Sequence, residues 1–220
     1  MDAVEEEHAL NLIFGQLSKL KKGEKLKVAM DVDDTVAEVS PAVKKILEEK
    51  HGLSFGGVGR HYNWYRSKTT DRHFLAAYNE LWSARWKEIK PLLSPQAFLM
   101  LSERTDFSFI SARGKEAGEP LYRWVLHHYG KRANVSVVEA NPYSMHGIKK
   151  MDTGYDLLVD DSPHVSSTME HELAKGKALL LIDKWDEALK QRNRKNTAVV
   201  ANAEHAADLI FDAHEVHSIS

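Results

Sequence analysis

The chain has 220 residues, of which 43% are hydrophobic and 28% charged, a composition typical of a globular protein. It contains no cysteine, which excludes disulfides, thiolate nucleophiles and thiolate metal sites. The net charge of −2 provides no overall field for nucleic acid or an anionic membrane, and no apolar run approaches the roughly 20 residues of a membrane span. Residues 1–8 are acidic and lack the layout of a signal peptide, so we expect a cytoplasmic protein with no membrane partner.

The first predicted element is a helix over residues 3–20, whose apolar side chains recur at spacings of three and four. Two lysines and a glycine at 21–23 are typical of a helix end. A short apolar strand is expected at 26–31. A second helix is predicted to begin at Ser40 as N-cap, followed by a proline, and to stop at Gly52.

The next stretch contains helical patterns and no strand pattern. Residues 53–70, rich in glycine and aromatic side chains, are expected to form a loop, and residues 71–89 a helix. Ser94, followed by a proline, begins another helix that ends near Arg104. Residues 37–104 therefore look like a helical insertion.

Beyond this insertion, short apolar strands alternate with helices. We expect strands at 106–110, 134–138, 155–159, 177–182 and 197–201. We expect helices at 116–129, 164–175 and 203–212, the last capped by Asn202. Such alternation predicts a doubly wound α/β fold, with a parallel sheet covered on both faces. The expected organisation is an N-terminal helix (1–24), an α/β core (25–36 and 105–220) and the helical cap (37–104).

Two carboxylates, Asp31 and Asp33, stand at the exit of the first strand. Like charges this close both stay ionised only beside a cation, and otherwise one of them holds a proton. Either outcome suggests chemistry: a hard metal ion bound by oxygen, or one carboxylate as nucleophile and the other as acid/base. The alternative is an ordinary Asp-rich turn after a strand.

Other strands deliver matching groups to the same edge, because ligands of open parallel sheets bind beyond the carboxyl ends of the strands. The second strand ends with Ser111 and Ala112, and the fourth with Asp160 and Asp161. A lysine pair, residues 149–150, precedes the fourth strand. Carboxylates for Mg²⁺, a hydroxyl and an ammonium group form a set suited to phosphoryl transfer.

In this order, Asp-x-Asp-x-Thr at 31–35, Ser-Ala-Arg at 111–113, the lysine and Asp-Asp at 160–161 resemble the four motifs of the haloacid dehalogenase superfamily of phosphohydrolases. The resemblance covers residues 25–185. It implies a Rossmann-like core with a helical cap, and hydrolysis of a small phosphorylated substrate through an aspartyl-phosphate. It argues against dehalogenation, because dehalogenases of the superfamily lack the second acidic residue, here Asp33.

The resemblance also implies a role for each residue. Asp31 would be the nucleophile, Asp33 the general acid/base, and Lys150 the group that offsets negative charge. Ser111, with Ala112, would bind the phosphoryl group.

Mg²⁺ would be the cofactor. Its implied ligands are Asp31, the main-chain carbonyl of Asp33, and Asp161 with Asp160 in support. Three departures from the superfamily pattern are the helix before the first strand, Asp34 where many members have glycine, and Ser111 in place of the commoner threonine.

Within the superfamily, the chain is most similar to the 5'(3')-deoxyribonucleotidase group. The compact spacing from Lys150 to Asp161 resembles that group, and the aromatic segment 62–65 lies where the group places base-stacking residues. This implies a nucleotide substrate, most plausibly a deoxyribonucleoside monophosphate, with Trp64 in its binding site.

Several alternatives stay open at this point. Arg113 could contact a substrate phosphate or cap a helix, and either Lys149 or Lys150 could point inward. The substrate could be another small phosphate ester or a nucleic-acid end, although the net charge makes nucleic acid a poor partner. The fold could also serve a non-catalytic binding module. The N-terminal helix and the aromatic-rich cap could each supply an interface for a homo-oligomer.

Overall fold

The computed structural model describes residues 3–56, 60–113, 118–130, 133–139, 150, 153–169, 174–191 and 194–219. Its centre is a six-stranded sheet in the order β3-β2-β1-β4-β5-β6, in which all neighbouring strands are parallel. The strands are β1 (Lys27–Asp31), β2 (Asp106–Arg113), β3 (Asn134–Glu139), β4 (Leu157–Asp160), β5 (Ala178–Ile182) and β6 (Thr197–Val200). This topology confirms the predicted doubly wound α/β class.

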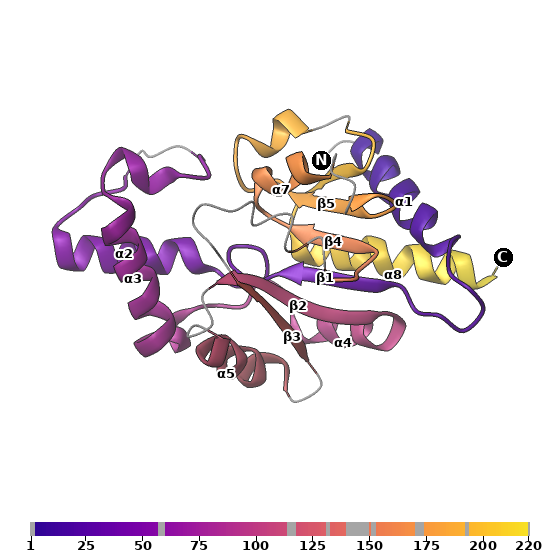
Figure 1. Ribbon diagram of the computed structural model, residues 1–220, viewed down its shortest axis with the longest axis horizontal. Coiled ribbons are helices and arrows are strands. Elements are labelled where there is room, and N and C mark those ends of the chain that lie inside the picture. Colours follow the sequence, from indigo (N-terminus) through magenta and orange to yellow (C-terminus); the bar gives the residue numbers. More distant parts are fainter. Residues whose placement is uncertain are drawn as a thin grey trace.

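The α-helices are α1 (Ala3–Leu17), α2 (Val39–His51), α3 (Asp71–Ala84), α4 (Pro95–Arg104), α5 (Gly118–Tyr129), α7 (Pro163–Thr168) and α8 (Ala203–Ile219). Helices α1, α4, α5, α7 and α8 pack against the sheet (Figure 1). Short 3₁₀ turns are η1 (Trp64–Ser67), η2 (Trp86–Glu88) and η5 (Ala188–Gln191). No helix among the described residues has both the length and the apolar character needed to cross a membrane.

The core lies on both faces of the sheet because the central strands are apolar throughout. Every described residue of β4, β5 and β6 is buried, as parallel strands covered on both sides require. The larger core cluster lies under α1, α4, α5 and α8, and includes the stacked rings of Phe98 and Phe109, both in contact with Tyr129. The smaller cluster lies under α7 on the opposite face and includes Leu158 and Val165.

Several predicted helix ends are confirmed by their hydrogen bonds. The Ser94 hydroxyl accepts the N–H of Ala97 at 3.1 Å and caps α4, and Asn202 accepts the N–H of His205 at 2.9 Å and caps α8. Gly52 follows α2 in a left-handed conformation at φ 62°, which glycine adopts without steric strain.

The predicted start of α2 is wrong. The helix begins at Val39, and Ser40 lies inside it instead of capping it. The cap comes from the loop after β1: Asp34 Oδ1 accepts the N–H groups of Val39 and Ser40 at 3.2 and 2.8 Å. The Ser40 hydroxyl donates to the other oxygen of the Asp34 carboxylate. A carboxylate at this end is also favoured by the helix dipole.

Several other bounds differ from the prediction, among them the end of α1, which is Leu17 instead of residue 20. The helix predicted over 71–89 ends at Ala84, and η2 follows it. The described part of α7 ends at Thr168, short of residue 175, while α8 runs on to Ile219. In α3 the apolar spacing continues past the end of the helix, so hydrophobic periodicity alone does not fix where a helix stops.

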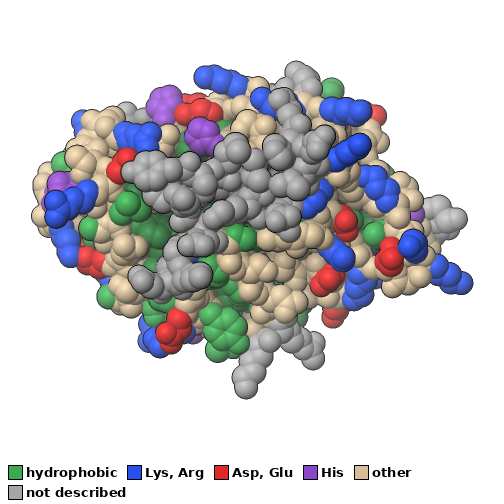
Figure 2. All heavy atoms as spheres, viewed as in Figure 1, with side chains coloured by type: hydrophobic (Ala, Val, Ile, Leu, Met, Phe, Trp, Pro, Cys, Tyr) green, Lys and Arg blue, Asp and Glu red, His purple; other side chains and the backbone are tan. Residues whose placement is uncertain are grey.

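The helices of the predicted insertion do not all pack in the same place. α2, η1 and α3 lie beyond the carboxyl end of β1 (Figure 1), whereas α4 packs against α8 and β2. The division into a cap at 37–104 and a core stays a prediction, and we propose that α4 belongs with the core. α1, for which the sequence left open a role as an interface, packs against β6 and α8 within the chain. Charged side chains of both signs are interspersed over the face shown in Figure 2.

Candidate active site

A tight turn after the central strand carries the acidic residues. Asp31 is the last residue of β1, and the N–H groups of Val36 and Ala37 both donate to the carbonyl of Val32, at 3.1 and 2.9 Å. Asp34 takes a left-handed conformation at φ 62°, which Asp tolerates better than most residues. The chain therefore reverses direction directly after β1, and the turn holds its carboxylates at the carboxyl edge of the sheet.

Three carboxylates meet at this edge because β1 and β4 are parallel neighbours. Met30 pairs with Val159, so the residues that follow, Asp31 and Asp160, leave the sheet side by side. One carboxylate oxygen from each of Asp31, Asp160 and Asp161 lies within 4.8 Å of the others, and all three side chains are buried. The structure thus brings together three of the predicted metal ligands.

Lys150 joins two of these carboxylates. Its Nζ donates to Asp31 Oδ1 at 2.7 Å and to Asp160 Oδ2 at 2.6 Å, and the side chain is buried. Burial by itself would lower the pKa of Lys150, but the two carboxylates outweigh it and raise that pKa well above its usual value. Lys150 is therefore a charged inward lysine, and Lys149 lies outside the described residues.

The carboxylates are under electrostatic strain despite this lysine. Burial raises the pKa of Asp31 to about 7, with contributions from the negative charges of Asp160 and Asp33 and a partial offset from Lys150. Burial, followed by the charges of Asp34 and Asp160, raises the pKa of Asp161 well above its usual value. The site therefore favours additional positive charge.

Asp161 is oriented by two donors. The Trp185 indole N–H donates to Oδ2 at 2.6 Å, and the Thr35 hydroxyl donates to Oδ1 at 3.4 Å. The sequence signalled Thr35 only as the last residue of the acidic motif. It did not signal Trp185, which reaches the site from the loop after β5.

The side chain of Asp33 does not join the carboxylate cluster. Its Oδ2 accepts hydrogen bonds from the Tyr78 hydroxyl at 2.9 Å, Nη2 of Arg113 at 2.6 Å and the Ser111 hydroxyl at 3.3 Å. Its Oδ1 is buried and has no hydrogen-bond partner within the described part of the chain. The expected metal contact of the Asp33 carbonyl stays a prediction.

Arg113 is a buried member of the site. Its Nε donates to the Ser111 hydroxyl at 2.7 Å, and its guanidinium lies 4.2 Å from the ring centroid of Trp82. The sequence left two roles open for Arg113, a contact with a substrate phosphate or a helix cap, and neither includes this pairing with Asp33. The available signal was its position two residues after Ser111 on one strand, which places both side chains on the same face.

The predicted phosphate-binding residues lie at the expected edge. Ser111 is fully buried and bonded to both Arg113 and Asp33. Ala112, the next residue of β2, pairs with Val138 of β3. Their contact with a phosphoryl group stays a prediction.

Trp64 is not brought to the carboxylates. It is 3% exposed, its indole N–H donates to Ser40 Oγ at 3.2 Å, and its ring packs edge-on against Phe55 and Phe74. A ring covered in this way has no open face for a base to stack on, so its burial speaks against the predicted role. Within the aromatic segment 62–65, Tyr62 is the residue that contacts a side chain of the site, since its ring lies 5.9 Å from that of Trp185.

The balance of charge tests whether a metal ion fits. Among the described residues, the site's carboxylates are those of Asp31, Asp33, Asp34, Asp160 and Asp161. The cations paired with them are Lys150, Arg113 and Lys184. With all five ionised, the negative charge would exceed the positive charge by two, and the raised pKa values of Asp31 and Asp161 show that this excess is unfavourable without a further cation. A hard divalent cation with oxygen ligands, such as Mg²⁺, matches both this excess and the donor set.

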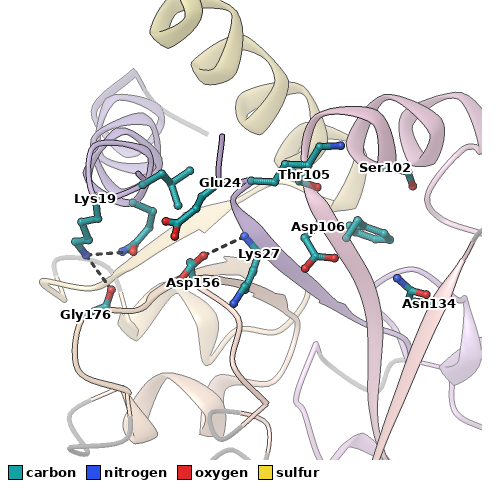
Figure 3. A pocket seen from close by; sticks show the side chains of 13 residues that line it. Lys19, Glu24, Lys27, Ser102, Thr105, Asp106, Asn134, Asp156 and Gly176 are labelled. Carbon is teal, nitrogen blue, oxygen red and sulfur yellow. Dashed lines mark hydrogen bonds between the residues drawn. The ribbon is translucent and has the colours of Figure 1, made fainter. Parts of the chain in front are cut away.

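A hollow lies at the opposite edge of the sheet. This cavity has a volume of about 660 Å³. Its lining, shown in Figure 3, includes Lys27, Asp106 and Asp156 at the amino ends of strands. We place the chemistry at the carboxyl edge instead, because only there, among the described residues, do buried carboxylates converge on one point.

Two solved structures share this fold. A protein from Clostridium difficile, provisionally named a phosphatase, matches 86% of this chain and 100% of its own at 15% identity, with a TM-score of 0.54. A protein from Bacteroides vulgatus, provisionally named a β-phosphoglucomutase, matches 98% of this chain and 100% of its own at 13% identity, with a TM-score of 0.50. No family model and no curated protein matches the chain. At such low identity the likeness shows the fold alone.

Proposed function

We propose that the protein is a Mg²⁺-dependent phosphomonoester hydrolase of the haloacid dehalogenase superfamily, with Asp31 as the nucleophile. The observation that carries this proposal is the buried cluster of Asp31, Asp160 and Asp161, with Lys150 bonded to two of its members. The order of the sequence motifs and the shared fold support it. A non-catalytic module would have no need for so much uncompensated buried charge.

The reaction has two steps. A carboxylate oxygen of Asp31 attacks phosphorus and the P–O ester bond breaks, which leaves a phosphoryl group on Asp31. The leaving oxygen keeps the electron pair of that bond and takes a proton from Asp33. Asp33 then takes a proton from water as the water oxygen attacks phosphorus, and inorganic phosphate leaves Asp31.

The residues around Asp31 offset the charge of the reacting group. Lys150 stays protonated between two carboxylates and stabilises negative charge on the phosphoryl oxygens, and the Ser111 hydroxyl can turn from Asp33 to a phosphoryl oxygen. Asp31, Asp160 and Asp161 would hold Mg²⁺, which supplies Lewis-acid polarisation of the phosphoryl group. Trp185 and Thr35 keep Asp161 in place for that task.

The substrate class is a small phosphate monoester. A deoxyribonucleoside monophosphate is the first candidate, on the resemblance of the segment from Lys150 to Asp161 to nucleotidases. The burial of Trp64 removes the expected stacking residue, so any base would have to be held by other side chains.

Phosphate release tests the proposal. The purified chain is incubated with p-nitrophenyl phosphate, nucleoside monophosphates and sugar phosphates, with Mg²⁺ or with EDTA. We expect turnover that EDTA suppresses and that Asp31→Asn lowers at least about 1000-fold, because the nucleophile is lost. Asp208→Asn, an exposed carboxylate on α8, is the matched control and should leave the rate unchanged. Normal activity in Asp31→Asn would show that Asp31 is not the nucleophile. If no ester is hydrolysed, a non-catalytic module is favoured.

A further inference from the structure

Asp33 is held through one carboxylate oxygen by donors from separate parts of the chain. Tyr78 of α3 and Arg113 and Ser111 of β2 all donate to Oδ2. The other oxygen, Oδ1, is buried without a hydrogen-bond partner among the described residues. Oδ1 is therefore the carboxylate oxygen that the described residues leave available to a group arriving with the substrate.

The Arg113 side chain is itself held rigidly. Its Nε donates to Ser111, its guanidinium carbon lies 4.2 Å from the centroid of the Trp82 ring, and the residue is 3% exposed. Its Nη1 is also buried with no partner in the described part of the chain. A guanidinium fixed in this way sets the position of the carboxylate that it contacts.

One face of α3 supplies both supports. Tyr78 and Trp82 are four residues apart on this helix, so they project side by side toward the site. Tyr78 contacts Asp33 directly, and Trp82 contacts the arginine that contacts Asp33. The orientation of Asp33 therefore depends on where α3 lies.

We propose that Tyr78 and Arg113 are positioning residues that hold Asp33 by Oδ2 and reserve Oδ1 for proton transfer. This inference rests on the proposed function, in which Asp33 is the acid/base. As the ester bond breaks, the proton on Oδ1 goes to the leaving oxygen, and Oδ1 later takes a proton back from the attacking water. Because Tyr78 belongs to α3, Asp33 is oriented for this transfer only while α3 covers the carboxyl edge of the sheet.

The test compares two esters of similar size. Phenyl phosphate releases a strongly basic oxygen that needs a proton, whereas p-nitrophenyl phosphate releases a weakly basic oxygen that does not. We measure kcat/KM for both with Mg²⁺, since this ratio reports the step in which the ester bond breaks. Asp33→Asn should lower kcat/KM for phenyl phosphate by about 100-fold more than kcat/KM for p-nitrophenyl phosphate. Tyr78→Phe and Arg113→Lys should shift the same ratio by about 10-fold.

A double variant and a control separate positioning from general damage. Adding Tyr78→Phe to Asp33→Asn should change the ratio no further, because the hydroxyl acts through Asp33. Tyr129→Phe removes a buried hydroxyl that donates to the Leu93 carbonyl at 2.8 Å, and should leave the ratio unchanged. If Arg113→Lys does not fold, Tyr78→Phe alone decides the question.

The outcomes distinguish the two proposals. If the wild-type protein hydrolyses neither ester, the proposed function fails, and the positioning of an acid/base fails with it. The wild-type protein and Asp33→Asn could behave as expected while Tyr78→Phe lowers kcat/KM equally for both esters or leaves it unchanged. In that case the hydrolase stands and the positioning role is overturned.

Discussion

The two edges of the sheet both carry lysines and carboxylates, but in different surroundings. At the amino edge, the cavity in Figure 3 is lined by charged side chains that are exposed apart from the half-buried Asp156. Two of its lysines, Lys19 and Lys25, donate to main-chain carbonyls. At the carboxyl edge, the side chains of Asp31, Lys150, Asp160 and Asp161 are each no more than 7% exposed.

This difference separates a solvated surface from a site that can do chemistry. Exposed charges are screened by water and interact weakly, so the size of a hollow says little about its function. Buried charges keep their mutual repulsion, which appears here as the raised pKa values of Asp31 and Asp161. Each prediction below changes one buried or partly buried group and compares it with an exposed one.

The largest effect on stability is expected from the buried lysine. Lys150→Met leaves Asp31 and Asp160 buried without their cation, which should lower the free energy of unfolding by about 3–5 kcal/mol. Lys27→Met at the amino edge removes an exposed charge and should change it by less than about 0.5 kcal/mol. Urea unfolding in EDTA measures both. Equal losses in the two variants would show that the carboxyl edge is no more strained than the amino edge.

The next effect is stabilisation by Mg²⁺. A cation bound only by the folded protein, at about 100 times its Kd, raises the free energy of unfolding by about 2.7 kcal/mol. We expect thermal unfolding of the wild-type protein and of Asp106→Asn, an exposed carboxylate at the amino edge, to shift upward with Mg²⁺. Asp161→Asn should lose most of this shift. A full Mg²⁺ response in Asp161→Asn would place the ion elsewhere.

The smallest expected effect is on the pH dependence of stability, and it comes from His128 on α5. The Nε2 atom of His128 is buried without a hydrogen-bond partner among the described residues. Burial, with the neighbouring His127, lowers the pKa of His128 below its usual value. The unfolded chain therefore binds more protons as the pH falls below about 6.5, and stability falls with it.

His128→Gln should reduce this loss of stability between about pH 7 and pH 5. The difference should stay well under about 1 kcal/mol, because solvent reaches part of the ring and screens its charge. His51→Gln, an exposed histidine on α2, serves as the control in urea unfolding at the two pH values. A steeper acid dependence in His128→Gln than in the wild-type protein would contradict the sign.

Local patterns in the sequence were sufficient for much of the fold. The apolar runs of the six strands, the Ser94 and Asn202 caps and the glycine after α2 depend on neighbouring residues, so they could be predicted one segment at a time. The convergence of Asp31, Asp160 and Asp161 also followed from a general rule, since parallel strands end at one edge.

The cap of α2 and the partners of Asp33 could not be predicted in this way. Asp34 caps a helix from across a turn, and Tyr78 looked like one more residue in the apolar stripe of α3. Trp64 looked available for stacking because the segment around it resembled a loop, yet its ring is covered by the insertion.

The sequence by itself determined which residues carry charge and at which end of each strand they stand, because hydrophobic periodicity and motif order are properties of short segments. Only the tertiary structure decided which of those charges lose their water and which side chain faces which. Burial and pairing depend on how distant segments pack, as when α3 brings Tyr78 to Asp33, forty-five positions away in the chain.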